Sequence, residues 1–210
     1  MDENTSTRRE TSRDQIVQAA HALFLQHGYN GTSMRAIAQQ AGVALGGIYN
    51  HFASKEEIFR AILLEKHPYF DLLEAMNAAE GETVDLLLRD AARRMVACLG
   101  ERPDFLNLMF IELVEFRRQH IPMLFDLFFP MIMQFAERLS AHSEALRPIP
   151  YPVLMRAFLG LFFSYVLTEI MLSENLPKDA NTSALDYVTD IFLNGVLVVP
   201  VQTSASGEQQ

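Results

Sequence analysis

The sequence predicts an all-α fold, and three observations support that prediction. Apolar residues recur at intervals of three and four along most of the 210-residue chain, as on the buried face of a helix. Gly and Pro residues separate these stretches where helices are expected to end. No stretch alternates polar and apolar residues as a half-buried strand does. We therefore expect a small N-terminal domain of three helices, including a helix-turn-helix, joined to a larger C-terminal helical domain.

Composition and charge fit a globular protein of a reducing compartment. Half of the residues are apolar and a fifth are charged, so the chain can bury a core. The net charge of −9 arises entirely from residues 67–210, because residues 1–66 hold seven basic and seven acidic side chains. The single cysteine, Cys98, excludes an internal disulfide, and the polar N-terminus does not resemble a secretory signal. The longest apolar run, 157–167, is too short to cross a bilayer, so we expect a cytoplasmic protein without a membrane segment.

The first predicted helix follows a polar N-terminal arm. Residues 1–10 are polar, and we expect them to be disordered. Ser12 is a suitable N-cap for a helix that ends at His27, just before Gly28. The buried stripe of this helix is expected to contain Ile16, Ala19, Ala20, Leu23 and Phe24.

Residues 32–52 have the proportions of a helix-turn-helix. A turn is expected around Gly42, which tolerates a positive φ. The second helix then runs from Ala44 or Leu45 to about His51. The residues expected to face inward are Ile37, Ala38, Val43, Ile48 and Phe52. The outward positions, which are free to enter a DNA major groove, are Leu45, Gly46, Gly47, Tyr49, Asn50 and His51.

The rest of the chain is predicted to consist of helices separated by Pro and Gly. Ser54 and Glu57 form a capping box for a helix over 54–66, which Pro68 ends. The stretch 147–152 contains three prolines and cannot be helical. Further helices are expected over 69–79, 82–99, 103–119, 121–145, 153–173 and 182–198, with a kink at Pro130.

The N-terminal part of the chain resembles the DNA-binding domain of TetR-family transcriptional regulators. The resemblance covers residues 15–63, and so many matches at fixed spacing are a specific signal. The matching residues are Ile16, Ala19, Ala20, Leu23, Phe24, Gly28, Tyr29, Thr32, Ser33, Ile37, Ala38, Ala41, Gly42, Val43, Ile48, Tyr49, His51, Phe52, Ser54, Lys55 and Glu56. The resemblance implies a helix-turn-helix DNA-binding domain over 11–53, a connecting helix over 54–67, a ligand-binding and dimerisation domain over 68–200, and a disordered tail over 201–210.

Candidate DNA contacts lie on the helix-turn-helix and at the start of the helix that follows it. Ser33 either caps its helix or binds a phosphate oxygen, and Arg35 either contacts the DNA or is simply solvated. The resemblance implies phosphate contacts for Tyr49 and His51, with a core-capping role as the alternative for His51. Lys55, at a helix N-terminus, is the strongest candidate. The full set is Thr32, Ser33, Arg35, Ala44, Leu45, Gly46, Gly47, Tyr49, Asn50, His51 and Lys55.

Two positions depart from the family pattern. The family commonly has a lysine where this chain has Leu45, and a serine or threonine where it has Gly47. Gly46 and Gly47 allow the backbone to approach the groove closely but supply no side-chain donor. Leu45 suits contact with a thymine methyl group. These two positions therefore do not indicate which operator sequence the protein recognises.

The C-terminal domain is rich in Phe and Met over residues 105–135. These residue types line adaptable apolar cavities, so one interpretation is a pocket for an apolar small molecule. Plain core packing is the alternative for each of them. The candidate ligand-binding residues are Phe105, Met109, Phe110, Glu112, Phe125, Phe128, Phe129, Phe162 and Tyr165.

The last two predicted helices are expected to form a homodimer interface. The helix over 153–173 is apolar on nearly every side, so one side has to pack against its own domain and the other against a second copy of the chain. The helix over 182–198 has an apolar seam in which Gly195 permits close approach. Paired across a two-fold axis, the two helices would form a four-helix bundle, as the resemblance to TetR-family proteins implies.

These expectations describe a ligand-responsive transcriptional regulator. We expect a repressor that binds palindromic operator DNA as a homodimer and is released when an apolar small-molecule effector shifts the helix over 54–66. A helical carrier for lipid-like molecules, without DNA binding, is the alternative. No enzyme activity, cofactor or metal is expected, because the six histidines are scattered. Glu112, Glu115 and His120 do not have the spacing of metal ligands, and residues 115–120 are interpreted as the end of a solvated helix.

Overall fold

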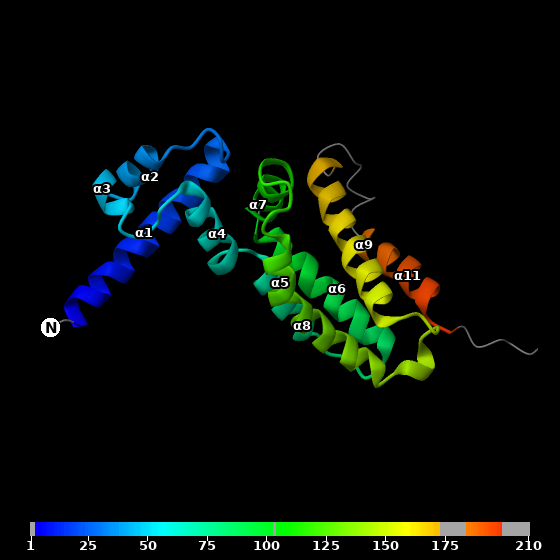
Figure 1. Cartoon of the computed structure of the whole chain (residues 1–210). Helices are drawn as coiled ribbons and strands as arrows, with labels where there is room; N and C mark the ends of the chain where they lie inside the picture. The colour runs from blue at the N-terminus through cyan, green and yellow to red at the C-terminus, as the bar shows by residue number, and fades with distance from the viewer. Residues whose placement is uncertain (1–2, 103, 173–183, 199–210) are drawn as a thin grey trace, which may run out of the picture. The chain divides into compact units, whose positions relative to one another are not determined.

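The computed structural model describes residues 3–102, 104–172 and 184–198 (Figure 1). Within these residues every regular element is helical, and the one pairing of β type is an isolated bridge between Leu146 and Leu197. The predicted all-α fold is confirmed. The elements are α1 (Glu3–His27), α2 (Met34–Gln40), α3 (Leu45–Ile48), α4 (Lys55–Glu65), α5 (Tyr69–Asn77), α6 (Val84–Gly100), α7 (Asp104–Phe110), the π-helix η1 (Ile111–Glu115), α8 (Ile121–Ser140), the 3₁₀-helix η2 (Ser143–Ala145), α9 (Tyr151–Leu172) and α11 (Ala184–Val196). The tail predicted over 201–210 lies outside the described residues.

The chain packs as two compact units. The first unit comprises residues 1–72 and 99–130, and the second comprises residues 73–98 and 131–210. The helix-turn-helix therefore shares a packing unit with α7, η1 and the first half of α8. The predicted boundaries near residues 53 and 67 do not coincide with this division, because α1 packs against α7 as well as against α2 and α4.

Helix α1 is longer than predicted. It begins at Glu3, so residues 3–10 are helical instead of forming the expected disordered arm. No Gly or Pro occurs between Glu3 and His27, so nothing in the backbone stops the helix at Ser12. The helix ends as predicted, because Gly28 has a φ of +71° and its N–H donates to the carbonyl of Phe24 at 2.9 Å.

Helices α1, α2 and α4 meet in an apolar core. Burial of each large apolar side chain in this core, such as Phe24 or Ile58, contributes roughly 1.5–3 kcal/mol. An ion pair between Arg13 Nη2 and Glu65 Oε1, at 2.5 Å, joins α1 to the end of α4. The position of α4 relative to α1 is therefore fixed along its whole length. Residues with exposed fractions of 1% or less in these helices and in α3 are Ile16, Val17, Ala20, Phe24, Ile37, Ile48, Ile58, Phe59, Ile62 and Leu63.

Helices α2 and α3 form the predicted helix-turn-helix. Ser33 caps α2, because its Oγ accepts the N–H of Ala36 at 3.1 Å. The turn contains Gly42 with a φ of +68°. Helix α3 has only four residues, whereas the sequence predicted a helix to His51. Two adjacent glycines within it lower the helix propensity, and residues 49–51 continue as turns.

The helix predicted over 103–119 is interrupted. Helix α7 ends at Phe110 and continues as the π-helix η1, after which Arg117 and Arg118 have φ values of +49° and +71°. A π-helix accommodates an extra residue in its turn, and positive φ values then reverse the chain without a glycine. Helix α8 follows, ends at Ser140 rather than at residue 145, and contains Pro130 in its interior.

The core of the second unit is built around one side of α9. The ring of Phe158 lies 6.0 Å from that of Phe135, 4.8 Å from Phe162 and 5.4 Å from Phe192, measured between centroids. These rings connect α8, α9 and α11. The other buried side chains of α9 are Leu154, Met155 and Val166.

Candidate nucleic-acid interface

Helix α3 exposes one side and buries the other. Ile48 is fully buried and Phe52 is 5% exposed, which fixes the inward side. On the outward side, Tyr49 is 54% exposed and Leu45 is 43% exposed. An exposed side on the second helix of a helix-turn-helix is what insertion into a major groove requires. Ala44, Gly46 and Asn50 are also exposed, and Gly47 and His51 are half-buried.

Gly46 and Gly47 leave the backbone of α3 uncovered. A Cβ atom added at either position would meet no heavy atom within 4 Å. The space beside the helix is therefore open, and it is not filled by a neighbouring part of the protein. This openness supports the prediction that the backbone of α3 can approach a groove closely.

Ser33 and Arg35 lie on the surface at the start of α2. Both residues are exposed. The N-cap interpretation of Ser33 is confirmed by its bond from Ala36, and its hydroxyl can still donate a hydrogen to another acceptor. Together with the outward side of α3, these residues form the candidate DNA surface: Ser33, Arg35, Ala44, Leu45, Gly46, Gly47, Tyr49, Asn50 and His51.

Thr32 does not belong to that surface, which corrects the sequence prediction. Its side chain is 3% exposed, and Oγ1 lies 2.9 Å from the carbonyl of Gly28 and 3.2 Å from that of Leu23. Its N–H donates to Tyr29, and its carbonyl accepts from Lys55. The physical reason is that the hydroxyl satisfies carbonyl groups at the end of α1, where the chain turns towards α2.

Lys55 has a structural role that the sequence does not predict. Its Nζ donates to the carbonyls of Tyr29 at 2.5 Å and Thr32 at 2.7 Å, and it lies 4.1 Å from the centroid of the Tyr29 ring. Burial lowers the pKa of this ammonium, and the nearby Glu115 opposes the shift. Lys55 therefore ties the start of α4 to the loop before α2. A phosphate contact by Lys55 has to use its remaining ammonium hydrogen or its backbone N–H.

An aromatic cluster fastens α4 to the end of α1 and to the segment after η1. The ring of Phe116 stacks on Phe59 at 4.7 Å with an interplanar angle of 11°, and it lies 4.6 Å from the ring of Tyr29. Such pairs contribute roughly 0.5–1.5 kcal/mol each beyond their burial. Phe116 was not predicted from the sequence, because its position depends on the π-helix that precedes it.

Glu112 and His120 form a buried pair beside this cluster. Glu112 is 1% exposed and His120 is 6% exposed. Oε1 of Glu112 accepts the backbone N–H of His120 at 2.7 Å, and Oε2 lies 2.8 Å from His120 Nδ1. The interpretation of residues 115–120 as a solvated helix end is therefore wrong for His120. Both carboxylate oxygens already have partners, so the ligand-orienting role predicted for Glu112 is not supported.

The other residues predicted to bind an apolar ligand have different environments. Three are core residues with exposed fractions of 6% or less: Phe105, Phe128 and Phe162. Three have exposed fractions between 38% and 56%: Phe110, Phe125 and Phe129. Two are half-buried: Met109 and Tyr165. Of these, Phe162 and Tyr165 belong to the second unit and the rest to the first. Their joint role as a pocket stays a prediction.

Phe105 and Phe128 pack around a buried histidine where α4 passes into α5. His67 is 3% exposed, its ring stacks on Tyr69 at 4.9 Å, and its Nδ1 accepts the N–H of Tyr69 at 3.2 Å. Burial lowers the pKa of His67 to about 4. The neutral imidazole is therefore part of the core of the first unit.

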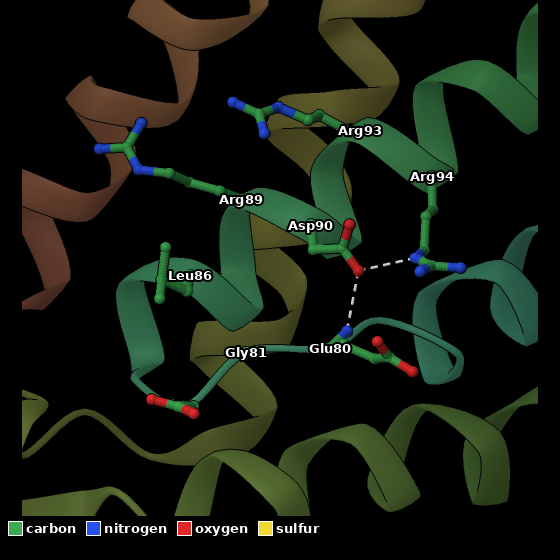
Figure 2. A pocket seen from close by; sticks show the side chains of 8 residues that line it. Glu80, Gly81, Leu86, Arg89, Asp90, Arg93 and Arg94 are labelled. Carbon is green, nitrogen blue, oxygen red and sulfur yellow. Dashed lines mark hydrogen bonds and ion pairs between the residues drawn. The ribbon is translucent and has the colours of Figure 1, made fainter.

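The second unit contains a cavity of about 440 Å³ with a charged lining (Figure 2). This cavity was not predicted from the sequence. The carboxylate of Asp90 accepts the N–H of Glu80 at 2.8 Å and Nε–H of Arg94 at 2.7 Å, and these bonds lower the pKa of Asp90. A lining of this kind does not fit the predicted apolar pocket. Its residues are Glu80, Gly81, Glu82, Leu86, Arg89, Asp90, Arg93 and Arg94.

The remaining arginines of this cavity join α6 to α11. Arg89 Nη2 lies 2.5 Å from Asp190 Oδ1, and Arg93 Nη2 lies 3.2 Å from Asp186 Oδ1. Hydrogen bonds from Arg89 to Asp85 and to Asp190 raise the pKa of its guanidinium. The arginines of the cavity are therefore engaged within the protein, and they fix the packing of the second unit.

The helix-turn-helix region identifies the family. The sequence profile of the group described as bacterial regulatory proteins, tetR family, matches residues 16–62. Over residues 16–62 this chain belongs to the tetR family. The matched residues include α2 and α3, which carry the candidate DNA surface, together with the C-terminal half of α1 and most of α4. The family consists of transcription regulators and not of enzymes.

Individual relatives agree with this assignment. UidR of Escherichia coli strain K12, an HTH-type transcriptional regulator, is 35% identical over 65 residues, which are 31% of this chain and 33% of that protein. The chain thus matches about a third of the length of the first curated relatives.

The fold extends over most of the chain. A tetR-family transcriptional regulator from Mesorhizobium loti MAFF303099 gives a TM-score of 0.68 at 22% identity, over 91% of this chain and 99% of that one. FadR from Bacillus subtilis, solved in complex with stearoyl-CoA, gives a TM-score of 0.64 at 23% identity, over 86% of this chain and 97% of that one. At these identities the likeness shows the fold alone.

Proposed function

We propose that the protein is a ligand-responsive transcription regulator that binds palindromic operator DNA as a homodimer. It acts in the cytoplasm as a repressor, and an apolar small molecule releases it from the operator. The observation that supports this most is the outward side of α3, where Leu45 and Tyr49 face solvent while Ile48 anchors the helix in the core. Two copies of α3 would enter successive major grooves about 34–36 Å apart on one face of the DNA.

The homodimer is supported by exposed apolar side chains on α9 and α11, which pack against each other in the second unit. On α9, Ile170 is 57% exposed and Met171 is 66% exposed. On α11, Tyr187 is 69% exposed and Ile191 is 71% exposed. Large apolar groups concentrated in this way favour an interface between subunits. Two copies of both helices would form a four-helix bundle across a two-fold axis.

Helix α9 is also long and apolar enough to cross a membrane, with a mean hydropathy of 1.6. This is weak support for a membrane segment, because the core helix of a soluble protein passes the same test. Leu154, Phe158 and Phe162 of α9 are buried within the second unit. We infer that a second subunit, rather than lipid, covers the exposed side of the helix.

An apolar effector is supported by the aromatic surface of α7 and α8. Phe125 and Phe129 stack with their ring centroids 5.0 Å apart, and both are more than a third exposed. The FadR protein that shares this fold was solved with stearoyl-CoA, a molecule with a long acyl chain. An effector with a long apolar part is therefore the class that we propose. A coupling of roughly 1–3 kcal/mol between effector and DNA would lower operator affinity about 5–150-fold.

The test starts with selection of DNA duplexes from a randomised pool by the purified protein. We expect enrichment of a palindromic sequence and an affinity that falls linearly with salt on a log–log plot, with a slope of about −0.9 for each phosphate contacted. Asn50→Ala should weaken binding, whereas Asn107→Ala, at an exposed position of α7, should not. No enrichment, or equal binding by Asn50→Ala and the original protein, would contradict the proposal and favour the lipid-carrier alternative.

A further inference from the structure

The turn between η1 and α8 presents two adjacent arginines in an unfavourable backbone conformation. Arg117 and Arg118 are exposed, and their φ values of +49° and +71° lie in the left-handed region. Residues other than glycine keep this conformation only where the surrounding structure imposes it, and such sites often have a function. Here the backbone N–H of Arg118 donates to the carbonyl of Glu112 at 3.0 Å, and that of Gln119 donates to Phe116 at 3.0 Å.

Contacts on both sides of the turn attach it to the DNA-facing part of the first unit. Glu115, just before the turn, accepts a hydrogen bond from the side chain of Asn30, which lies three residues before Ser33. Gln119, just after it, donates to Glu56 Oε1 at 2.5 Å, and Glu56 is the neighbour of Lys55. The α7–η1 segment also packs on α1, beside the α1–α2 loop and α4 (Figure 1). The two arginines thus lie beside the α1–α2 loop and the start of α4.

The carboxylates around the turn have hydrogen-bond partners other than the two arginines. The carboxylate of Glu115 is bonded to Asn30, that of Glu56 to Gln119, and that of Glu112 to His120. Within the described residues, no ion pair involves Arg117 or Arg118. The turn therefore presents two guanidinium groups to solvent at the edge of the candidate DNA surface.

We propose that Arg117 and Arg118 bind backbone phosphates of the operator beside the α1–α2 loop. This inference rests on the proposed DNA-binding function and adds to it a contact from outside the helix-turn-helix. A guanidinium suits this role because its planar donors bind phosphate oxygens in pairs. Phosphate contacts carry no sequence information directly, so the turn raises affinity for any duplex without changing the preferred sequence.

The experiment measures affinity against KCl concentration for a duplex that the unmodified protein has selected from a randomised pool. If each arginine neutralises one phosphate, the double variant R117A/R118A should lower the magnitude of the log–log salt slope by about 1.8. It should also bind roughly tenfold more weakly at about 150 mM KCl, and it should select the same sequence. R117K/R118K, which keeps the charge, should retain the slope. The matched control Arg147→Ala, at an exposed position of the second unit, should behave as the original protein.

A second variant separates lost charge from a damaged turn. Glycine is at ease in the left-handed region, so R117G/R118G should unfold at the same or a higher temperature and still lose the same salt slope. An unchanged slope in the glycine variant would overturn the inference. If the original protein selects no duplex at all, the proposed function itself fails. If Asn50→Ala weakens binding while both arginine variants bind normally, only the phosphate contact proposed here is wrong.

Discussion

Chain reversals in the first unit are achieved in two different ways. Around the helix-turn-helix, the chain reverses at Gly28 and Gly42, with φ values of +71° and +68°. After η1 it reverses at Arg117 and Arg118, with similar positive values. Glycine adopts this conformation readily, whereas it costs another residue about 1–2 kcal/mol. The helix-turn-helix is therefore favoured by its local sequence, and the α7–η1 segment has to be held in shape by contacts elsewhere.

Those contacts can be named. The carboxylate of Glu112 holds His120 by two bonds, and the ring of Phe116 stacks on Phe59 of α4. At the other end of the segment, Arg102 Nη2 donates to the carbonyl of Lys66 at 2.7 Å, where α4 ends. The segment that departs most from regular helix geometry is thus fastened to α4, the helix that links the helix-turn-helix to the rest of the chain.

The largest effect is expected from Glu112→Ala. Removing the carboxylate leaves the N–H and ring of His120 without their buried partner, and breaking a buried pair costs about 3–5 kcal/mol. Urea unfolding near neutral pH should report a loss of this size. Glu115→Ala removes an exposed carboxylate from the same segment and should change the free energy of unfolding by less than about 0.5 kcal/mol. Equal effects of the two variants would show that the buried pair does not hold the segment.

A slightly smaller loss of stability is expected when the pH is lowered, because His67, which is buried beside Phe105, then becomes protonated. Burial lowers the pKa of His67 to about 4, below its ordinary value of 6.5, so the unfolded chain takes up the proton first. Its contribution to stability is complete above pH 6.5 and is lost as the pH falls to about 4, amounting to roughly 3 kcal/mol. His67→Gln cannot be protonated and should show a flatter pH dependence over this range. His27→Gln, at an exposed position, should follow the original protein. If stability depends on pH in the same way in the original protein, His67→Gln and His27→Gln, then His67 is not a neutral, buried imidazole.

The features that could be predicted from the sequence are those that depend on neighbouring residues. The caps at Ser33 and Ser54, the glycine reversal at Gly42 and the buried stripe of α1 all depend on residues within a few positions of one another. Such local signals are visible in residue spacing, and the predicted order of helices followed from them. The exposure of Tyr49 followed in the same way, from a helix whose inward residue, Ile48, was evident.

The features that were missed depend on contacts between distant residues. Thr32 and Lys55 were both predicted to face DNA, but their polar groups bond to each other and to the end of α1. The pairing of Glu112 with His120 depends on a π-helix, for which residue spacing gives no signal. The packing of α7 against α1, which places residues 99–130 in the first unit, likewise depends on contacts between distant residues.

The smallest effects are expected from alanine substitutions at Gly42, in the turn, and at Gly46, in α3. They test whether local backbone preference shapes the helix-turn-helix. A Cβ at either position meets no atom within 4 Å, so substitution by alanine changes only the backbone preference. Gly42→Ala should destabilise the protein by about 1–2 kcal/mol, because φ is positive there. Gly46→Ala should stabilise it by up to about 1 kcal/mol, because the residue is helical. Thermal unfolding of the two variants should therefore shift in opposite directions. If both variants unfold at the same temperature, tertiary contacts rather than glycine fix the helix-turn-helix, and the contrast with the arginine turn disappears.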